Sequence, residues 1–398
     1  MLAETRTRSA PRPDPRAGRA AALAAAAAGQ EVIEDEAGGV HVLRYAEVER
    51  LLMEPRLAGV GLSIFDRMGV TDGPLRAWYG SLMFTNEGQP HNRLRRLVGK
   101  AFSPRAVEAL RPVAARLVAE RLAPIEGAGE GDLVPALGDV AMHVMCALLG
   151  VPADDVPAFI DWVGALGPTF GFMQRAELEA ATCAIVALLA YVDGLRERRE
   201  RAPADDLITA LIAAEDGGER LTRDETVAMV ANLLVGGHDT TTSQIGCTLL
   251  TLLPRPEVLA LAGEAALRPS IVSETIRYEA AIGGAPRTVA EPLEVGGVVR
   301  ATGTVVICST AAANRDPAVW ESPDAFDPSR FVEPTAPRLL AFGGGPHHCL
   351  GAWLARLTLE EVVAGVSTVR PTLTVDPDAI PWVQNLGASP ARLPVTVG

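Results

Sequence analysis

Cysteine is scarce in this sequence and never closely paired. Five cysteines are spread over 398 residues, and no two of them form a CxxC arrangement. An odd number of distant cysteines excludes a disulfide framework and the usual cysteine spacing of a zinc site. Only Cys349 has unusual neighbours. The others lie in apolar runs such as HVMCALLG and TVVICST, where cysteine acts as a small buried hydrophobe: Cys146, Cys183, Cys247 and Cys308.

A net positive charge and a long Gly/Ser linker are also lacking. The formal net charge of -13 argues against a nucleic-acid partner and against adsorption on anionic lipid. The alanine-rich stretch at 17–29 predicts a surface helix, because it is too weakly apolar to span a membrane, which takes roughly 20 apolar residues. With no repeat or Gly/Ser linker, we expect a flexible lead at 1–16 and a single domain at 17–398. The default expectation is a monomeric, cytoplasmic protein without a membrane partner.

Apolar residues at three- and four-residue spacing predict long helices in the middle of the chain. The clearest stretches are 103–125, 177–201 and 222–253. Strand-like pieces are few and short, as in EVIEDEAGGVHVL and at 293–308, where β-branched runs flank Gly-Gly turns. The fold class predicted is mainly α, with small peripheral β-sheets.

The predicted helix at 222–253 is interrupted in its centre by GGHDTT, residues 236–241. Adjacent glycines are costly inside a helix, and hydroxyls there can bond to backbone carbonyls. We therefore expect a kink or a π-type bulge at 236–240. A packing notch and a ligand close to the helix backbone both explain the pattern.

Cys349 stands in FGGGPHHCLG, residues 342–351, ahead of the helix-forming run LGAWLARLTLEEVVAGV. Glycines allow positive φ and close backbone approach, and Pro346 fixes one turn. A helix N-terminus stabilises a thiolate, which suits a metal centre or a nucleophilic cysteine. Alone, the stretch is equally a Gly-rich loop with an incidental cysteine.

Three further segments carry charged residues at helical spacing or in a long loop. Glu274 and Arg277 share one helix face in SETIRYE, and His91 and Arg95 do so in PHNRLRRLV. Taken singly, these are an exposed ion pair and a solvated basic face. A proline-punctuated loop, ANRDPAVWESPDAFDPSRF, ends near Arg330.

Together these five segments, in this order, resemble the cytochrome P450 family of haem-thiolate monooxygenases from about residue 40 to the end. FGGGPHHCLG is similar to the family's cysteine-ligand loop, and GGHDTT to its oxygen-binding groove. Glu274 and Arg277 match its buried Glu-Arg pair, which Arg330 would join. The resemblance implies a cytochrome P450 fold around a buried heme b (haem), with O2 as co-substrate and Cys349 as the axial ligand of the iron.

The same resemblance assigns roles to individual residues. Asp239 and Thr240 would deliver protons during oxygen activation. Phe342 would shield the sulfur, and Gly351 occupies a fixed position after the ligand. His348 would face solvent. The haem propionates would be held by four cationic side chains: His91, Arg95, Arg287 and His347.

The resemblance also implies an apolar substrate pocket for a lipophilic small molecule. Two departures from the family pattern concern its shape. Gly283 and Gly284 replace the usual proline after Arg277, and the acid-proline-proline-acid run ahead of His91 appears as EGQP, residues 87–90, in which Glu87 matches the first acid. The residues expected to line the pocket are Phe84, Phe170, Phe172, Leu233, Gly236, Ile282 and Leu386.

Electrons would come from a separate ferredoxin and an NAD(P)H-dependent ferredoxin reductase, because the chain carries no flavin-type or cysteine-cluster sequence. Arg93, Arg96, Lys100 and Arg105 form a basic group on which an acidic ferredoxin is expected to dock. The reaction expected is hydroxylation or epoxidation. A non-oxygenating rearrangement, a haem-based sensor and, more distantly, a cysteine hydrolase are the alternatives.

Overall fold

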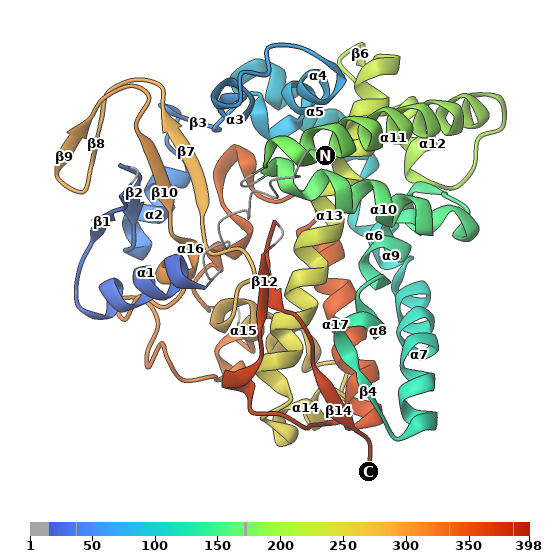
Figure 1. The fold of residues 1–398 in the computed structure, drawn as a ribbon, viewed down its shortest axis with the longest axis vertical. Coiled ribbons are helices and arrows are strands. Elements are labelled where there is room, and N and C mark those ends of the chain that lie inside the picture. Colours follow the sequence, from blue (N-terminus) through green and yellow to red (C-terminus); the bar gives the residue numbers. More distant parts are fainter. Residues whose placement is uncertain (1–15, 37, 171–172, 334, 385) are drawn as a thin grey trace, which may run out of the picture.

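Helices dominate the computed structural model, which describes residues 16–36, 38–170, 173–333, 335–384 and 386–398. The predicted mainly α class is confirmed (Figure 1). The helices of eight or more residues are α1 (Ala17–Ala27), α2 (Tyr45–Leu52), α4 (Pro74–Ser81), α5 (Gly88–Ala101), α7 (Arg111–Ala128), α9 (Val140–Leu149), α10 (Val156–Leu166), α11 (Arg175–Arg201), α13 (Arg223–Leu252), α15 (Arg268–Tyr278) and α17 (Ala352–Val369). Shorter helices are α3 (Ser63–Arg67), α6 (Pro104–Glu108), α8 (Leu133–Leu137), α12 (Leu207–Ala213), α14 (Pro256–Leu261) and α16 (Thr310–Ala313).

The strands form small sheets at the periphery, as the sequence predicts. The largest has the order β1-β2-β10-β7-β3 and lies beside α2, on the left of Figure 1. Its strands are β1 (Val32–Glu34), β2 (Val40–Val42), β3 (Leu57–Ala58), β7 (Ala285–Val289) and β10 (Val305–Cys308). A three-stranded sheet joins β4 (Glu130–Asp132), β11 (Thr372–Leu373) and β14 (Pro394–Thr396). Three pairs complete the set: β5 (Glu215–Asp216) with β6 (Glu219–Arg220), β8 (Leu293–Val295) with β9 (Val298–Arg300), and β12 (Trp382–Gln384) with β13 (Ala388–Pro390).

Helix α13 runs through the centre of the helical part of the molecule (Figure 1). It begins where Thr222 and Glu225 form a capping box, each side chain accepting a bond from the other residue's backbone N–H. It then packs against α9, α10, α11, α15 and α17. Because these helices surround α13, residues on its different faces contact different neighbouring helices.

The expected π-type bulge at 236–240 is wrong, because α13 is an unbroken α-helix from Arg223 to Leu252, whereas the expected kink stays a prediction. The threonine hydroxyl does bond to a carbonyl one turn back, from Thr240 Oγ1 to Gly236 O at 2.8 Å. Such a bond can accompany an intact backbone ladder. Packing on several sides therefore keeps the α-helix unbroken at its glycines.

The predicted helix at 103–125 is two helices, α6 and α7, whereas the one predicted at 177–201 is confirmed as α11. Pro112 stands in the first turn of α7. In a continuous helix its ring would clash with the carbonyl four residues earlier, so the chain restarts there. The surface helix expected at 17–29 is α1.

One helix among the described residues, α11, is long and apolar enough to cross a membrane by length and composition alone. The mean hydropathy of its most apolar 18-residue window is 1.7, and 33% of that window is buried. The same helix packs against α4, α10, α12 and α13. Core helices of soluble proteins meet the same criteria, so this gives only weak support for a membrane span.

Candidate active site

The loop that carries Cys349 is fixed by glycines that no other residue could replace without strain. Gly343 and Gly345 have φ values of +71° and +62°, a region that side chains with a Cβ disfavour. A Cβ on Gly345 would also lie 2.6 Å from the carbonyl oxygen of Leu52, at the end of α2. The Cys349 N–H donates to the Phe342 carbonyl at 2.9 Å. The loop therefore presents its sulfur in one position just ahead of α17.

Cys349 faces a cavity of about 240 Å³ between its loop, α5 and α13. On the far wall Gly236 and Gly237 of α13 line the same space. A Cβ on Gly236 would meet no atom within 4 Å, so the helix backbone is open to the cavity there. The cavity lining is completed by Met83, Phe84, His91, Arg95, Phe102, Met145, Asn232, Leu233, His347, His348, Leu350 and Gly351.

The Cys349 sulfur is accessible from the cavity, although protein atoms surround the rest of the side chain. Burial raises the pKa of this thiol above its usual value, while the Gly351 N–H, Arg95 and Arg356 act in the opposite direction. The helix-start argument from the sequence is therefore wrong about the net effect on the pKa. It is right that backbone amides after the cysteine bond to its sulfur, as the Gly351 N–H does.

Arg95 and two histidines gather at one edge of the cavity, where burial lowers the pKa of His91 below its usual value. The rings of His91 and His347 lie 4.3 Å apart, centroid to centroid, and His347 Nε2 is 2.8 Å from Glu87 Oε2. Arg95 makes no hydrogen bond or ion pair with any residue that the structure describes, and burial lowers its pKa. Such a guanidinium, half-buried without a counter-ion, suits an anionic ligand.

Three other residues that the sequence places near the cysteine or the propionates lie in different surroundings. His348 lines the cavity instead of facing solvent, and burial lowers its pKa, so that expectation is wrong. Arg287 lies on β7, opposite Val306 of β10, and is not part of the cavity lining. Phe342 stacks on Arg356, whose guanidinium carbon is 4.4 Å from the ring centroid.

Asp239 and Thr240 follow the cavity-lining glycines on α13 but do not line the cavity themselves. The Asp239 side chain is buried and makes no hydrogen bond within the described chain, and His238 Nε2 lies 3.8 Å from Asp239 Oδ1. Burial raises the pKa of Asp239 to about 6 and lowers that of His238 to about 4. Thr240 reaches the cavity wall through its bond to the Gly236 carbonyl.

The predicted Glu274–Arg277 pair is fully buried and bidentate. Both contacts measure 2.7 Å, from Arg277 Nε and Nη2 to the two carboxylate oxygens. Arg277 also donates to the carbonyls of Asn314, Pro323 and Ala325. A guanidinium bonded on all sides offsets the cost of burying it. The third expected member lies nearby, since Arg330 Nε is 3.6 Å from Glu274 Oε1.

Asn314 is a structural residue that the sequence reasoning missed. Its carbonyl accepts from Arg277, and its side-chain Oδ1 accepts from the Leu340 N–H at 2.9 Å. Leu340 begins the short turn that leads into the cysteine loop. The residue thus connects the buried ion pair to the loop, and only its place in the ANRDP run could have suggested this.

Phe84, which lines the cavity, belongs to a cluster of aromatic side chains behind it. The Phe170 ring lies 5.9 Å from Phe84, 5.5 Å from Tyr79 and 6.3 Å from Trp78, centroid to centroid. Of the predicted pocket residues, Phe84, Leu233 and Gly236 line the cavity. Phe170 packs behind Phe84, Ile282 and Leu386 lie elsewhere, and Phe172 falls outside the described residues.

The predicted basic group, which lies on α5 and at Arg105 of α6, is largely neutralised within the chain. Asp216 of the β5–β6 hairpin contacts both Arg96 Nε and Lys100 Nζ at 2.7 Å. Arg93 pairs with Glu225 at 2.7 Å. Arg105 is exposed and makes no ion pair with a described residue.

The donor set of the cavity fits a flat, anionic cofactor that carries a thiophilic metal. One wall supplies a single sulfur ligand, the opposite wall is bare helix backbone, and an unpaired arginine and two histidines stand at the edge. No group of three or more His, Cys, Asp or Glu side chains in the described chain could hold a bare metal ion. Fold and cavity together define the class of helical proteins that hold a metal-bearing cofactor against a cysteine.

Comparisons with known proteins agree with this class. The family model described as Cytochrome P450 matches residues 168–265 and 266–366. The chain is 40% identical over 322 residues to the Nocardicin C N-oxygenase of Nocardia uniformis subsp. tsuyamanensis, covering 79% of each chain. It is 39% identical over 275 residues to the Mycinamicin IV hydroxylase/epoxidase of Micromonospora griseorubida, covering 68% and 67% of the two chains. The crystal structure of CalO2 matches with a TM-score of 0.88 and 30% identity over 96% of each chain.

The chain belongs to the cytochrome P450 family. It is a P450 monooxygenase that uses haem b and molecular oxygen, and the resemblance seen in its motifs is confirmed.

Proposed function

We propose that this P450 hydroxylates or epoxidises a lipophilic small molecule in the cavity above Cys349, which acts as the axial ligand of the haem iron. The observation that carries the proposal is the cavity shared by Cys349 and the helix backbone of Gly236 and Gly237, which is open at Gly236. When bound there, haem supplies oxygen activation, and thiolate ligation favours O–O cleavage. The other roles fall to residues of the chain itself.

The cationic edge would bind and orient the cofactor. Arg95 is available without breaking an existing pair, whereas His347 must exchange its contact with Glu87 for a propionate. His91 is 1% exposed, so its ring would be held in a fixed orientation. Arg287 would reach the second propionate from β7, beside the helical part of the site. Charge-assisted bonds of this kind hold a carboxylate more firmly than neutral ones.

Asp239 and Thr240 would handle protons on the far wall of the cavity. With a pKa of about 6, the Asp239 carboxyl can both hold and release a proton near neutral pH. Thr240 would pass that proton on by turning its hydroxyl away from the Gly236 carbonyl. The Phe84, Tyr79 and Phe170 rings would exclude water and favour an apolar substrate.

An acidic ferredoxin, itself reduced by an NAD(P)H-dependent reductase, is the electron donor that we propose. Arg105 is free to meet it, but Arg96 and Lys100 must first leave Asp216. The enzyme would act as a monomer in the cytoplasm, with residues 17–398 as one domain. Charge complementarity of this kind mainly raises the association rate.

The absorption spectrum of the reduced, carbon-monoxide-bound protein tests the ligand assignment. We expect the red-shifted Soret band of thiolate ligation in the wild type and in Cys183→Ser, whose cysteine is exposed on α11. Cys349→Ser should lose the red shift. A red-shifted band in Cys349→Ser would overturn the assignment. In the wild-type enzyme, a screen for ligand-induced spin-state changes would identify substrates.

A further inference from the structure

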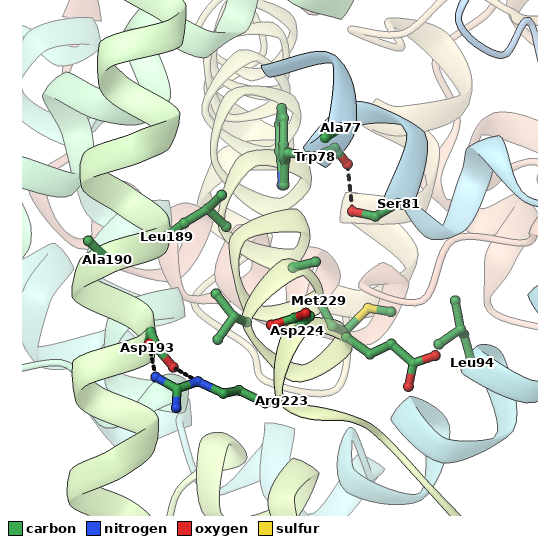
Figure 2. Close-up of a pocket in the computed structure, with 13 residues that line it drawn as sticks. Ala77, Trp78, Ser81, Leu94, Leu189, Ala190, Asp193, Arg223, Asp224 and Met229 are labelled. Carbon is green, nitrogen blue, oxygen red and sulfur yellow. Dashed lines mark hydrogen bonds and ion pairs between the residues drawn. The ribbon is translucent and has the colours of Figure 1, made fainter. Parts of the chain in front are cut away.

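A second cavity lies on the other side of the aromatic rings and shares no lining residue with the cavity at Cys349. This outer pocket has a volume of about 500 Å³ and lies between α4, α5, α11 and α13 (Figure 2). Trp78 connects the outer pocket to the aromatic cluster, because it lines the pocket and packs edge-on against Phe170. The residues lining the outer pocket are Ala77, Trp78, Ser81, Leu94, Leu189, Ala190, Asp193, Arg223, Asp224, Glu225, Val227, Ala228 and Met229.

Trp78 brings an unused hydrogen-bond donor to this pocket. The side chain is 3% exposed, and its indole Nε1–H has no partner. Figure 2 shows the nitrogen end of the ring directed toward the space between Leu189, Asp224 and Met229. Buried donors are nearly always paired, because an unpaired one costs stability. A ligand with a hydrogen-bond acceptor at this position would satisfy the indole.

The charges at the mouth of the pocket leave one carboxylate unpaired. Asp193 is held by Arg223, with one contact of 2.8 Å from Nε to Oδ1. Glu225 accepts from Arg93 at 2.7 Å and caps α13. Asp224 makes no ion pair or hydrogen bond with any described residue, and its carboxylate lies among the lining side chains (Figure 2). The pocket therefore carries one net negative charge beside an apolar wall.

We propose that the outer pocket is a second ligand site, which binds an amphiphilic organic cation. The cationic group would pair with Asp224, a carbonyl or ether oxygen would accept from Trp78 Nε1–H, and the apolar part would contact Leu189 and Met229. Cation and carboxylate complement each other in charge, and the acceptor matches the only orphaned donor that the pocket offers among the described residues. This ligand does not touch the haem cavity.

Hexanoylcholine and its neutral isostere, 3,3-dimethylbutyl hexanoate, test this proposal as probes. Calorimetric titration would use the haem-loaded enzyme with its iron and distal cavity occupied by 4-phenylimidazole. We expect hexanoylcholine to bind about fivefold more tightly than the ester, as an ion pair near the surface allows. Asp224→Asn should make the two probes bind equally. Asp205→Asn removes the same charge from an exposed position outside the pocket and should leave the preference intact.

Two further variants test the pocket independently of charge. Trp78→Phe keeps an aromatic ring but removes the donor, and it should weaken both probes alike, by about fivefold. Ala190→Leu fills the pocket without removing a polar group, so both probes should bind about tenfold more weakly even if Trp78→Phe does not fold.

Four results would overturn the proposal. Hexanoylcholine binding that disappears with 4-phenylimidazole would place the probe at the haem. Equal binding of the two probes to the wild type would remove the role of charge. A preference lost equally in Asp205→Asn would indicate a general surface-charge effect. Unchanged affinity in Ala190→Leu would exclude the pocket.

Discussion

Replacing Asp239 with asparagine is expected to stabilise the enzyme in a pH-dependent way. Burial raises the Asp239 pKa from 3.8 to about 6 in the folded chain. Between these values the folded state keeps a proton that the unfolded state has lost, so folding stability falls as the pH rises through this window. This difference in pKa lowers the free energy of unfolding by about 3 kcal/mol at pH 8 and by roughly half of that at pH 5, at ~1.36 kcal/mol per pKa unit.

An asparagine carries no charge, so Asp239→Asn removes this cost at either pH. Its amide has its own burial cost, but that cost does not depend on pH. The free energy of unfolding of the variant, relative to wild type, should therefore rise by about 1.4 kcal/mol between pH 5 and pH 8. Urea unfolding of the haem-loaded proteins at both pH values measures this difference.

Asp205→Asn is the matched control, because its carboxylate is exposed, and its effect should be the same at both pH values. If the free energy of unfolding of Asp239→Asn differed from that of wild type by the same amount at pH 5 and pH 8, the reasoning would be refuted. It would mean that water or a partner reaches the carboxylate and keeps its pKa near 3.8.

Three other substitutions address the cofactor loop, the buried ion pair and the electron donor. Glu274→Gln leaves a buried guanidinium without its counter-ion and should lower the free energy of unfolding by about 3 to 5 kcal/mol. Glu257→Gln, at an exposed position, should leave it unchanged. Equal urea midpoints for the two variants would contradict this. Gly345→Ala should lose haem on purification, because its Cβ would lie 2.6 Å from a carbonyl oxygen at positive φ. Gly99→Ala should retain haem, since its Cβ meets open space and the residue does not line the cavity; similar haem content in both would count against the loop geometry. Asp216→Asn releases the two α5 cations that it binds and should speed reduction by an acidic ferredoxin at low salt only; an effect that persists at high salt would exclude electrostatic steering.

The sequence predicts those parts of the fold and site that depend on local patterns. Helix α13 begins and ends within a residue of the predicted stretch because its caps and apolar spacing are local signals. The buried Glu274–Arg277 pair follows from helical spacing together with the family motif. The cysteine loop is recognisable because its glycines meet a steric requirement within a few residues.

The missed features depend on partners that are distant in the sequence. Arg96 and Lys100 are neutralised by Asp216, which lies more than a hundred residues further along the chain. The continuity of α13 at Gly236 comes from helices packed around it, and these override the low helix propensity of its glycines. The burial that raises the Asp239 pKa is likewise a property of the assembled helices.

The opposite walls of the cavity at Cys349, the proposed haem site, are held by different kinds of interaction. Behind the sulfur, Arg277, Asn314 and Leu340 are joined by directional hydrogen bonds. On the substrate side, Phe84 and Phe170 meet only through ring contacts. Hydrogen bonds fix positions, whereas ring packing tolerates exchange for other apolar side chains. Divergence in substrate range can therefore accumulate at the rings over evolutionary time while the oxidising centre of the enzyme stays unchanged.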